Sequence, residues 1–222
     1  MRVKAAVRGF TGATSFTVIT ASGVLYTFEA LYADSPAQLT VELEDWLHKD
    51  PYGPFASRQT YVRLSELGDE TPLVVNRIMY TIYKRDARHI KTVGSKRFGV
   101  QLLLKGIYVQ DELFYFHTSL RNLSNVDYDI DRVRFRIADR KVAKRTAVQE
   151  TLIEPVCRFN EIMAIKAGET VRNVWVFRKF TIPDDKVLVM DVFERNGGRH
   201  QSFMVGNTDL VDARTVTELK VR

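Results

Sequence analysis

The stretch YDIDRVRFRIADRKVAKRTAVQE, residues 128–150, decides which fold this chain is expected to adopt. Apolar and basic residues alternate through its first half. The apolar positions are Val133, Phe135 and Ile137, and the basic positions are Arg132, Arg134 and Arg136. A period of two is typical of a β-strand that buries one face and exposes the other. Ile130 is out of phase with the alternation, which predicts a β-bulge near Asp131.

A basic turn follows this arginine strand. Residues 138–141 predict the turn, and residues 146–153 predict a returning strand. The candidate interaction surface combines the bases of strand and turn, namely Arg132, Arg134, Arg136, Arg140, Lys141, Lys144 and Arg145. Like charges on one strand face are costly unless acids interleave with them. The expected partners are therefore either Glu150 and Glu154 or the acids of another protein.

β-strand patterns continue on both sides of the stretch. Residues 14–20 and 24–31 flank Ala21-Ser22-Gly23 and predict a β-hairpin. Other strands are predicted at 2–8, 38–43, 98–109, 113–120, 158–165, 171–180, 187–194 and 200–205, with a Pro/Gly-bearing loop at 48–59. In the last hairpin, Asn196-Gly197-Gly198 suits the positive φ of a tight turn. From residue 98 onward, the spacing predicts an antiparallel sandwich of roughly seven or eight strands.

One segment departs from the β pattern. Apolar residues recur there at three- and four-residue steps, at Leu73, Val74, Ile78, Met79 and Ile82. Pro72 suits a first helical turn, so a helix is predicted over residues 72–86. We therefore predict a mainly β chain with an N-terminal β domain at 1–70, truncated at its start, and a helical connector at 71–95. An immunoglobulin-like antiparallel β-sandwich is expected at 96–222.

The composition is that of an ordered globular protein, with 45% hydrophobic residues and 12 Gly. The net charge of +6 raises the question of nucleic-acid binding, because phosphates are neutralised by clustered Lys and Arg. Here, however, 33 bases are interspersed with 27 acids. The run at 140–145 is better explained as a solvated hairpin tip, and direct nucleic-acid binding is not expected.

Signatures of catalysis are absent from the sequence. There is no GxSxG, HExxH, GxxxxGK[ST], GxGxxG or CxxC. The histidines at 48, 89, 117 and 200 are widely separated, and Asp184-Asp185 is expected to shape a loop. Cys157 is the only cysteine, which excludes an internal disulfide and favours a small buried residue. We expect no enzyme, no cofactor and no metal.

Aromatic residues are abundant in the predicted sandwich. They include Tyr108, Phe114, Tyr115, Phe116, Trp175 and Phe177. Filling the core is the commoner role of such residues, and a surface that stacks on sugars or on nucleic-acid bases is the alternative.

Several long segments together resemble one known family, the Bacteroides conjugative-transposon TraN proteins. They are RFGVQLLLKGIYVQDELFYFHTSLRN (97–122), the stretch 128–150, KFTIPDDKVLVMDVFERNGGRHQSF (179–203), LVDARTVTELKV (210–221) and RVKAAVRGFTGATSFTVITASGVLYTFEALYAD (2–34). A more distant similarity, through the hairpin at 14–31, is to TrbG/CagX-like outer-membrane core subunits of type IV secretion machines.

The resemblance implies a non-enzymatic structural subunit of a conjugative mating-pair apparatus that acts through protein-protein contacts. Its partners would be other conjugation proteins, including a lipoprotein and an inner-membrane-anchored subunit, or further copies of itself. The opening MRVKAAVRGFTG lacks the apolar run of a leader peptide. We therefore expect a truncated chain whose native location is periplasmic or associated with the outer membrane. The alternatives are a nucleic-acid-binding accessory protein and a carbohydrate- or peptidoglycan-binding sandwich.

Overall fold

The computed structural model describes residues 9–19, 25–34, 61–62, 72–140 and 150–219. By its internal contacts the chain divides into two compact units, Met1–Gln59 and Thr60–Arg222. The predicted strands at 2–8 and 38–43 and the loop at 48–59 lie outside the described residues. The helix expected as a connector belongs to the second unit, so the predicted domain boundaries differ from this division.

The described part of the first unit is a β-hairpin. β1 (Thr14–Ile19) pairs antiparallel with β2 (Leu25–Ala30) in the register that places Phe16 opposite Phe28. The two rings stack with their centroids 5.2 Å apart. The hairpin predicted at 14–31 is therefore confirmed.

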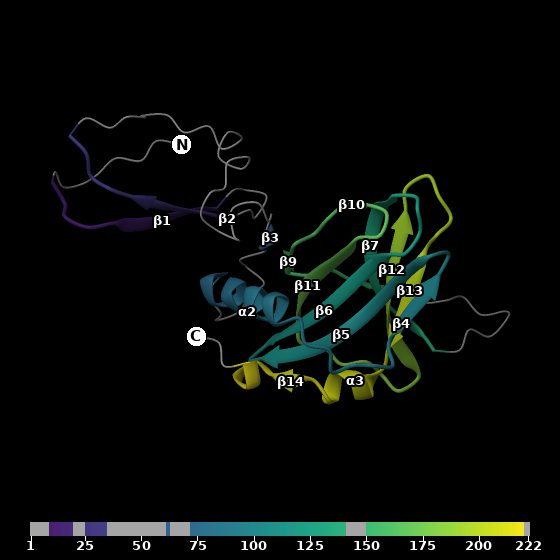
Figure 1. Cartoon of the computed structure of the whole chain (residues 1–222). Coiled ribbons are helices and arrows are strands. Elements are labelled where there is room, and N and C mark those ends of the chain that lie inside the picture. The colour runs from purple at the N-terminus through teal and green to yellow at the C-terminus, as the bar shows by residue number, and fades with distance from the viewer. Residues whose placement is uncertain (1–8, 20–24, 35–60, 63–71, 141–149, 220–222) are drawn as a thin grey trace. The chain divides into compact units, whose positions relative to one another are not determined.

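The second unit contains two β-sheets (Figure 1). The five-stranded sheet has the order β10-β7-β12-β13, and β8 also pairs with β7. The seven-stranded sheet has the order β14-β5-β6-β11-β9-β3, and β4 also pairs with β5. The strands are β3 (Tyr61–Val62), β4 (Gly94–Arg97), β5 (Val100–Gln110), β6 (Leu113–Asn122), β7 (Tyr128–Asp139), β8 (Thr151–Ile153), β9 (Cys157–Phe159), β10 (Ala164–Ile165), β11 (Thr170–Arg178), β12 (Lys186–Glu194), β13 (Gln201–Val205) and β14 (Arg214–Thr215).

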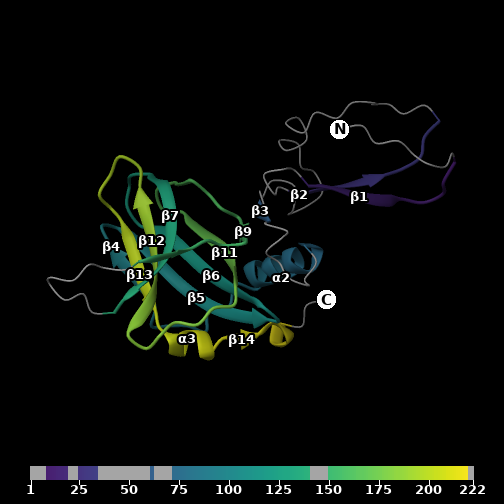
Figure 2. The same cartoon turned by 180° about the vertical axis from the view of Figure 1, so that it is seen from behind.

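Seven of these strands follow the order of an immunoglobulin constant-type sandwich. β5, β6, β11 and β9 take the places of strands A, B, E and D, and β7, β12 and β13 take those of C, F and G. Figure 2, which views the unit from behind, shows β7, β12 and β13 side by side. The mainly β, sandwich-type fold is thus confirmed. One short pairing departs from the antiparallel arrangement, since β14 pairs with β5 in parallel.

A core rich in aromatic residues lies between the two sheets. Phe135 of β7 contacts Trp175 and Phe177 of β11 edge to face, with centroid distances of 5.3 and 4.8 Å. Phe116 of β6 contacts Phe177 at 5.2 Å. Such T-shaped pairs stabilise a core beyond the effect of burial alone. The predicted aromatic set is buried throughout, as core filling requires.

Helix α2 (Pro72–Arg85) packs on the outer face of the seven-stranded sheet. Its buried residues Val75, Ile78, Met79 and Ile82 form a second core with one face of β6 and with Cys157. Because β6 has a core on each face, Leu113–Asn122 is almost entirely buried and shows no apolar–polar alternation. No described helix is long and apolar enough to cross a bilayer.

Three local features bear on the sequence predictions. The bulge expected near Asp131 is present, because Phe193 pairs with Arg132 while the next residue, Glu194, pairs with Ile130. The segment expected as one strand at 158–165 contains instead the end of β9 and all of β10, which lie in different sheets. In the last hairpin the positive φ belongs to Asn196, at 54°, and not to the glycines.

Candidate interaction surface

Two of the predicted surface arginines meet one acid on the neighbouring strand. Asp191 of β12 lies directly opposite Arg134 of β7. Its Oδ2 accepts hydrogen bonds from Arg134 Nη2 at 3.0 Å and from Arg136 Nε at 2.9 Å. Its Oδ1 accepts one from Ser202 Oγ of β13 at 2.9 Å. One carboxylate therefore joins three strands of the sheet.

Asp191 is ionised in this setting although it is buried. Burial alone would raise its pKa, but the hydrogen bonds from Arg136, Ser202 and Arg134 outweigh that effect and lower the pKa below its usual value.

Asp191 was not singled out from the sequence alone. Asp191 is the one acid inside the apolar run VLVMDVF at 187–193, and a charge in such a run indicates a partnered position.

Arg136 has a second partner. Its Nη1 donates to Glu150 Oε1 at 2.6 Å, so one of the two predicted acids does interleave with the arginines. The side chains of Arg134 and Arg136 are 35% and 18% exposed. The expectation that all three arginines stand on an open face is corrected for these two, which are engaged within the chain.

Arg132 differs from the other two arginines. Its side chain is 63% exposed and lies beside Asp131, at 3.5 Å between Nη1 and Oδ2. Its guanidinium stands 4.7 Å above the centre of the Phe193 ring. A cation–π contact at an exposed site contributes only about 0.5–1 kcal/mol. Arg132 is thus held loosely and remains accessible.

The bases of the predicted turn are only partly described. Arg140 is exposed and its backbone N–H donates to Asp185 O at 2.8 Å. Lys141, Lys144 and Arg145 lie outside the described residues.

A cleft of about 410 Å³ opens beside Arg132. It lies between the β7 segment around the bulge and the chain that joins β9 to β10. Its inner wall is apolar and includes Trp175, whose Nε1 donates to Thr118 Oγ1 at 2.9 Å. At its mouth, Arg158 forms an ion pair with Glu161 at 3.1 Å. A cleft of this kind accepts apolar groups next to the exposed guanidinium of Arg132.

A second polar cluster lies between helix α2 and the sheet. Asp86, just after the helix, forms ion pairs with Lys105 and, at 3.2 Å, with Arg172. His117 of β6 is fully buried, with Nε2 3.6 Å from Asp86 Oδ1. Burial lowers the pKa of His117 to about 4 and keeps the ring neutral at pH 7, because Lys105 and Arg172 also disfavour the imidazolium. The cluster fixes the helix end against the sheet.

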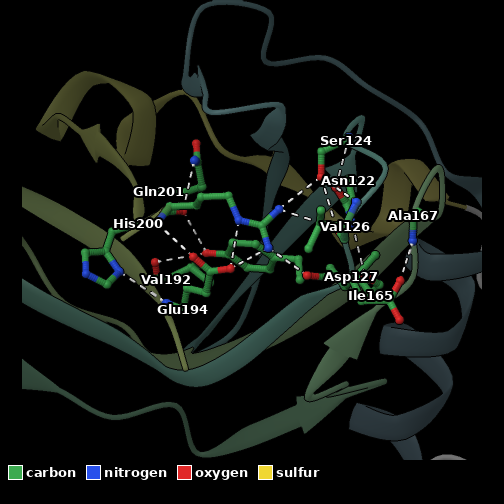
Figure 3. Close-up of polar contacts among 12 residues, drawn as sticks. Asn122, Ser124, Val126, Asp127, Ile165, Ala167, Val192, Glu194, His200 and Gln201 are labelled. Atoms are coloured by element: carbon green, nitrogen blue, oxygen red, sulfur yellow. Dashed lines mark hydrogen bonds and ion pairs between the residues drawn. The ribbon is translucent and has the colours of Figure 1, made fainter. Parts of the chain in front are cut away.

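Arg199, in the hairpin between β12 and β13, stabilises one end of the sandwich. Figure 3 shows its partners Ser124, Asp127 and Glu194. Its guanidinium contacts Glu194, Ser124 Oγ at 3.0 Å and Asp127 O at 2.6 Å. It also lies 5.2 Å from the ring centre of Tyr128. This Arg199 clamp ties the β6–β7 loop to the last hairpin. The hydrogen bonds from Arg199 also lower the pKa of the neighbouring Glu194 carboxyl group.

The other candidate catalytic and metal-binding residues do not form a cluster within the described part of the chain. No group of three or more His, Cys, Asp or Glu that could hold a metal ion occurs among them. Asp184 and Asp185 are exposed, Cys157 is buried, and His48 lies outside the described part. Phe98 is the one aromatic among the large apolar side chains that stand exposed in the described ranges, so no aromatic stacking face is seen there.

Comparison with known families gives a clear result for the second unit. Residues 72–215 match the model of DUF4138, a domain of unknown function. The chain belongs to the DUF4138 family. This family is found in conjugative-transposon TraN-like proteins. Residues 1–36 match a second model, DUF8473, also a domain of unknown function.

The DUF4138 match runs from α2 to β14 and so includes the helix, all strands of the two sheets except β3, and the arginines of β7. No curated protein matches the chain. Among solved structures, the chain is similar to Spo0M, a sporulation control protein from Bacillus subtilis, at 12% identity and a TM-score of 0.34. That similarity covers 57% of this chain and 50% of Spo0M.

Proposed function

We propose that this DUF4138 chain is a non-enzymatic structural subunit of a conjugative transfer apparatus, a type IV secretion machine of the TraN type. The observation that carries the proposal is the family match over residues 72–215, because the family is found in TraN-like proteins. The protein would work in the periplasm or at the outer membrane through contacts with other subunits.

The contact surface in this proposal is Arg132 together with the adjacent cleft. Arg134 and Arg136 already have carboxylate partners within the chain, whereas Arg132 is mostly exposed. A cleft with apolar residues on its inner wall, beside an accessible guanidinium, suits a partner that offers an apolar side chain with a nearby acid. Of the three arginines predicted on this strand, the proposed contact surface therefore keeps only Arg132, together with the cleft next to it.

The experiment uses donor cells in which the gene is deleted and complemented with tagged variants of the full chain. We expect the deletion to abolish transfer and the unmodified chain to restore it. Arg132→Glu should lower transfer and co-purification of envelope partners at least about tenfold, because a reversed charge opposes an acidic partner. Lys91→Glu, also at an exposed base, is the matched control and should behave like the parent.

Two results would count against the proposal. Transfer at the parental frequency in the deletion strain would contradict a role in the apparatus. Undiminished partner recovery with Arg132→Glu would contradict the assigned surface but not the role. Thermal unfolding of both variants should match the parent, since neither side chain is buried.

A further inference from the structure

The turn between β4 and β5 carries a residue that the turn geometry disfavours. Arg97 pairs with Val100, so Phe98-Gly99 is a two-residue hairpin loop. Both residues have positive φ, 54° for Phe98 and 74° for Gly99. Such loops favour Asn-Gly, because asparagine tolerates the left-handed region and a bulky aromatic residue does not. The backbone alone gives no reason for phenylalanine at this position.

Packing gives no reason either, because Phe98 is 64% exposed. Two further apolar residues stand exposed on the adjacent β6–β7 loop, Leu123 at 40% and Val126 at 65%. The loops are joined, since Leu123 N donates to Gly99 O at 2.6 Å. The Arg199 clamp holds the same loop through Ser124 and Val126 O. Phe98, Leu123 and Val126 therefore form one exposed apolar tip on a fixed support.

Basic residues surround this apolar tip. Lys96 and Arg97 precede Phe98, and Arg121 lies at the end of β6 next to the same loop. All three are exposed, and none forms an ion pair with another described residue. Acids also lie at this end, but each has another contact: Asp127 Oδ1 accepts a hydrogen bond from Ala167 N, Glu169 Oε2 accepts one from Lys166 N, and Glu194 is paired with Arg199. The bases beside the tip are thus left available for a negatively charged surface.

We propose that the apolar tip inserts into the surface of an anionic phospholipid bilayer, with Lys96, Arg97 and Arg121 at the level of the headgroups. Protruding apolar side chains need an apolar medium, and a basic rim is complementary to anionic lipid. Phe98, Leu123 and Val126 line neither the cleft beside Arg132 nor the cleft around His89 and Asp212, and their side chains project from the loops. This inference goes beyond the proposed function and does not depend on it.

Phe98→Asn tests the proposal because binding and stability should move in different directions. The full chain is floated with vesicles of phosphatidylcholine mixed with phosphatidylglycerol, or of phosphatidylcholine alone. We expect binding to the anionic vesicles that weakens as salt increases. Phe98→Asn should reduce the partition coefficient at least about tenfold. Its midpoint of thermal unfolding should equal or exceed that of the parent, because Asn-Gly suits the turn.

Two further variants complete the experiment. Arg97→Gln should weaken binding to anionic vesicles about fivefold, the effect of one base near such a surface. Val211→Asn removes an apolar side chain that is 75% exposed at the end of helix α3 (Asn207–Val211), which follows the far end of β13, and should leave vesicle binding unchanged.

Several outcomes would overturn the proposal. These are no binding to anionic vesicles at low salt, equal binding to neutral vesicles, and full binding by Phe98→Asn. A clear loss of stability in Phe98→Asn would show that Phe98 serves packing and would also overturn it. The lipid assignment also fails if the parent does not bind vesicles and Phe98→Asn loses a protein that co-purifies with the parent. In that case the tip is a contact site for a protein.

Discussion

Replacing Asp191 with asparagine tests whether the arginine face is held together from within the chain. The carboxylate accepts hydrogen bonds from Arg134 and Arg136 at 3.0 and 2.9 Å and from Ser202 at 2.9 Å. Asparagine has the same size and still offers one acceptor oxygen. It removes the negative charge between two guanidinium groups and sets an amide N–H₂ toward one of its neighbours.

The expected loss of stability follows from the number and burial of these bonds. A hydrogen bond to a charged group contributes about 1.5–3 kcal/mol, and Asp191 receives two from arginines. Because the Arg134 side chain is 35% exposed, solvent screening weakens the contribution of its hydrogen bond to stability. We expect Asp191→Asn to lower the free energy of unfolding by about 3 kcal/mol. For a unit of this size, that corresponds to a midpoint lower by roughly 6–12 °C.

Denaturant unfolding followed by fluorescence measures this loss, because Trp175 is buried between the sheets. Asp185→Asn, at an exposed acid, is the control and should be neutral. The folded pKa of Asp191 is lowered, so its contribution is complete above the unfolded value of about 4 and is lost as pH falls through the folded pKa. The difference between parent and variant should therefore shrink at acidic pH. A difference below about 0.5 kcal/mol at pH 7, or one that persists unchanged in acid, would refute the reasoning.

Two other predictions concern the polar groups around helix α2. His117 should titrate by NMR with a pKa of about 4, and stability should fall as pH drops from about 6.5 toward 4, because the unfolded imidazole binds a proton there. His117→Gln should make that slope shallower without abolishing it, because burial also lowers the pKa of His89. Gly106→Ala should cost about 1–3 kcal/mol in denaturant unfolding, since its new Cβ would lie 2.1 Å from His89 Cε1, whereas Gly198→Ala, in open space, should cost less.

Features set by neighbouring residues were predictable from the sequence. The alternation of Val133, Phe135 and Ile137 with arginines placed strand β7, and the phase break at Ile130 located its bulge. The three- and four-residue spacing after Pro72 gave helix α2 to within one residue. In each case, the periodicity of the side chains directly reflects the geometry of the backbone.

Features that depend on distant pairing were not predictable. Asp191 faces Arg134 only because β12 pairs with β7 in one particular register, across 57 residues of sequence. A shift by one residue would have turned its carboxylate to the other face. Likewise, no local pattern shows that residues 158–165 cross from one sheet to the other, because each short strand gains its partner from a different part of the chain.

The outer edge of β5 has a consequence for the order of events in synthesis. That edge is covered by β4 near its start and by β14 near its end, and the turn η2 (Val216–Leu219) completes the core under helix α2. A chain leaving the ribosome from its N-terminus has β4 before β5, but it lacks β14 and η2 until the rest of the sandwich has been made. We therefore expect this unit to close late, with the end of the β5 edge uncovered until β14 emerges.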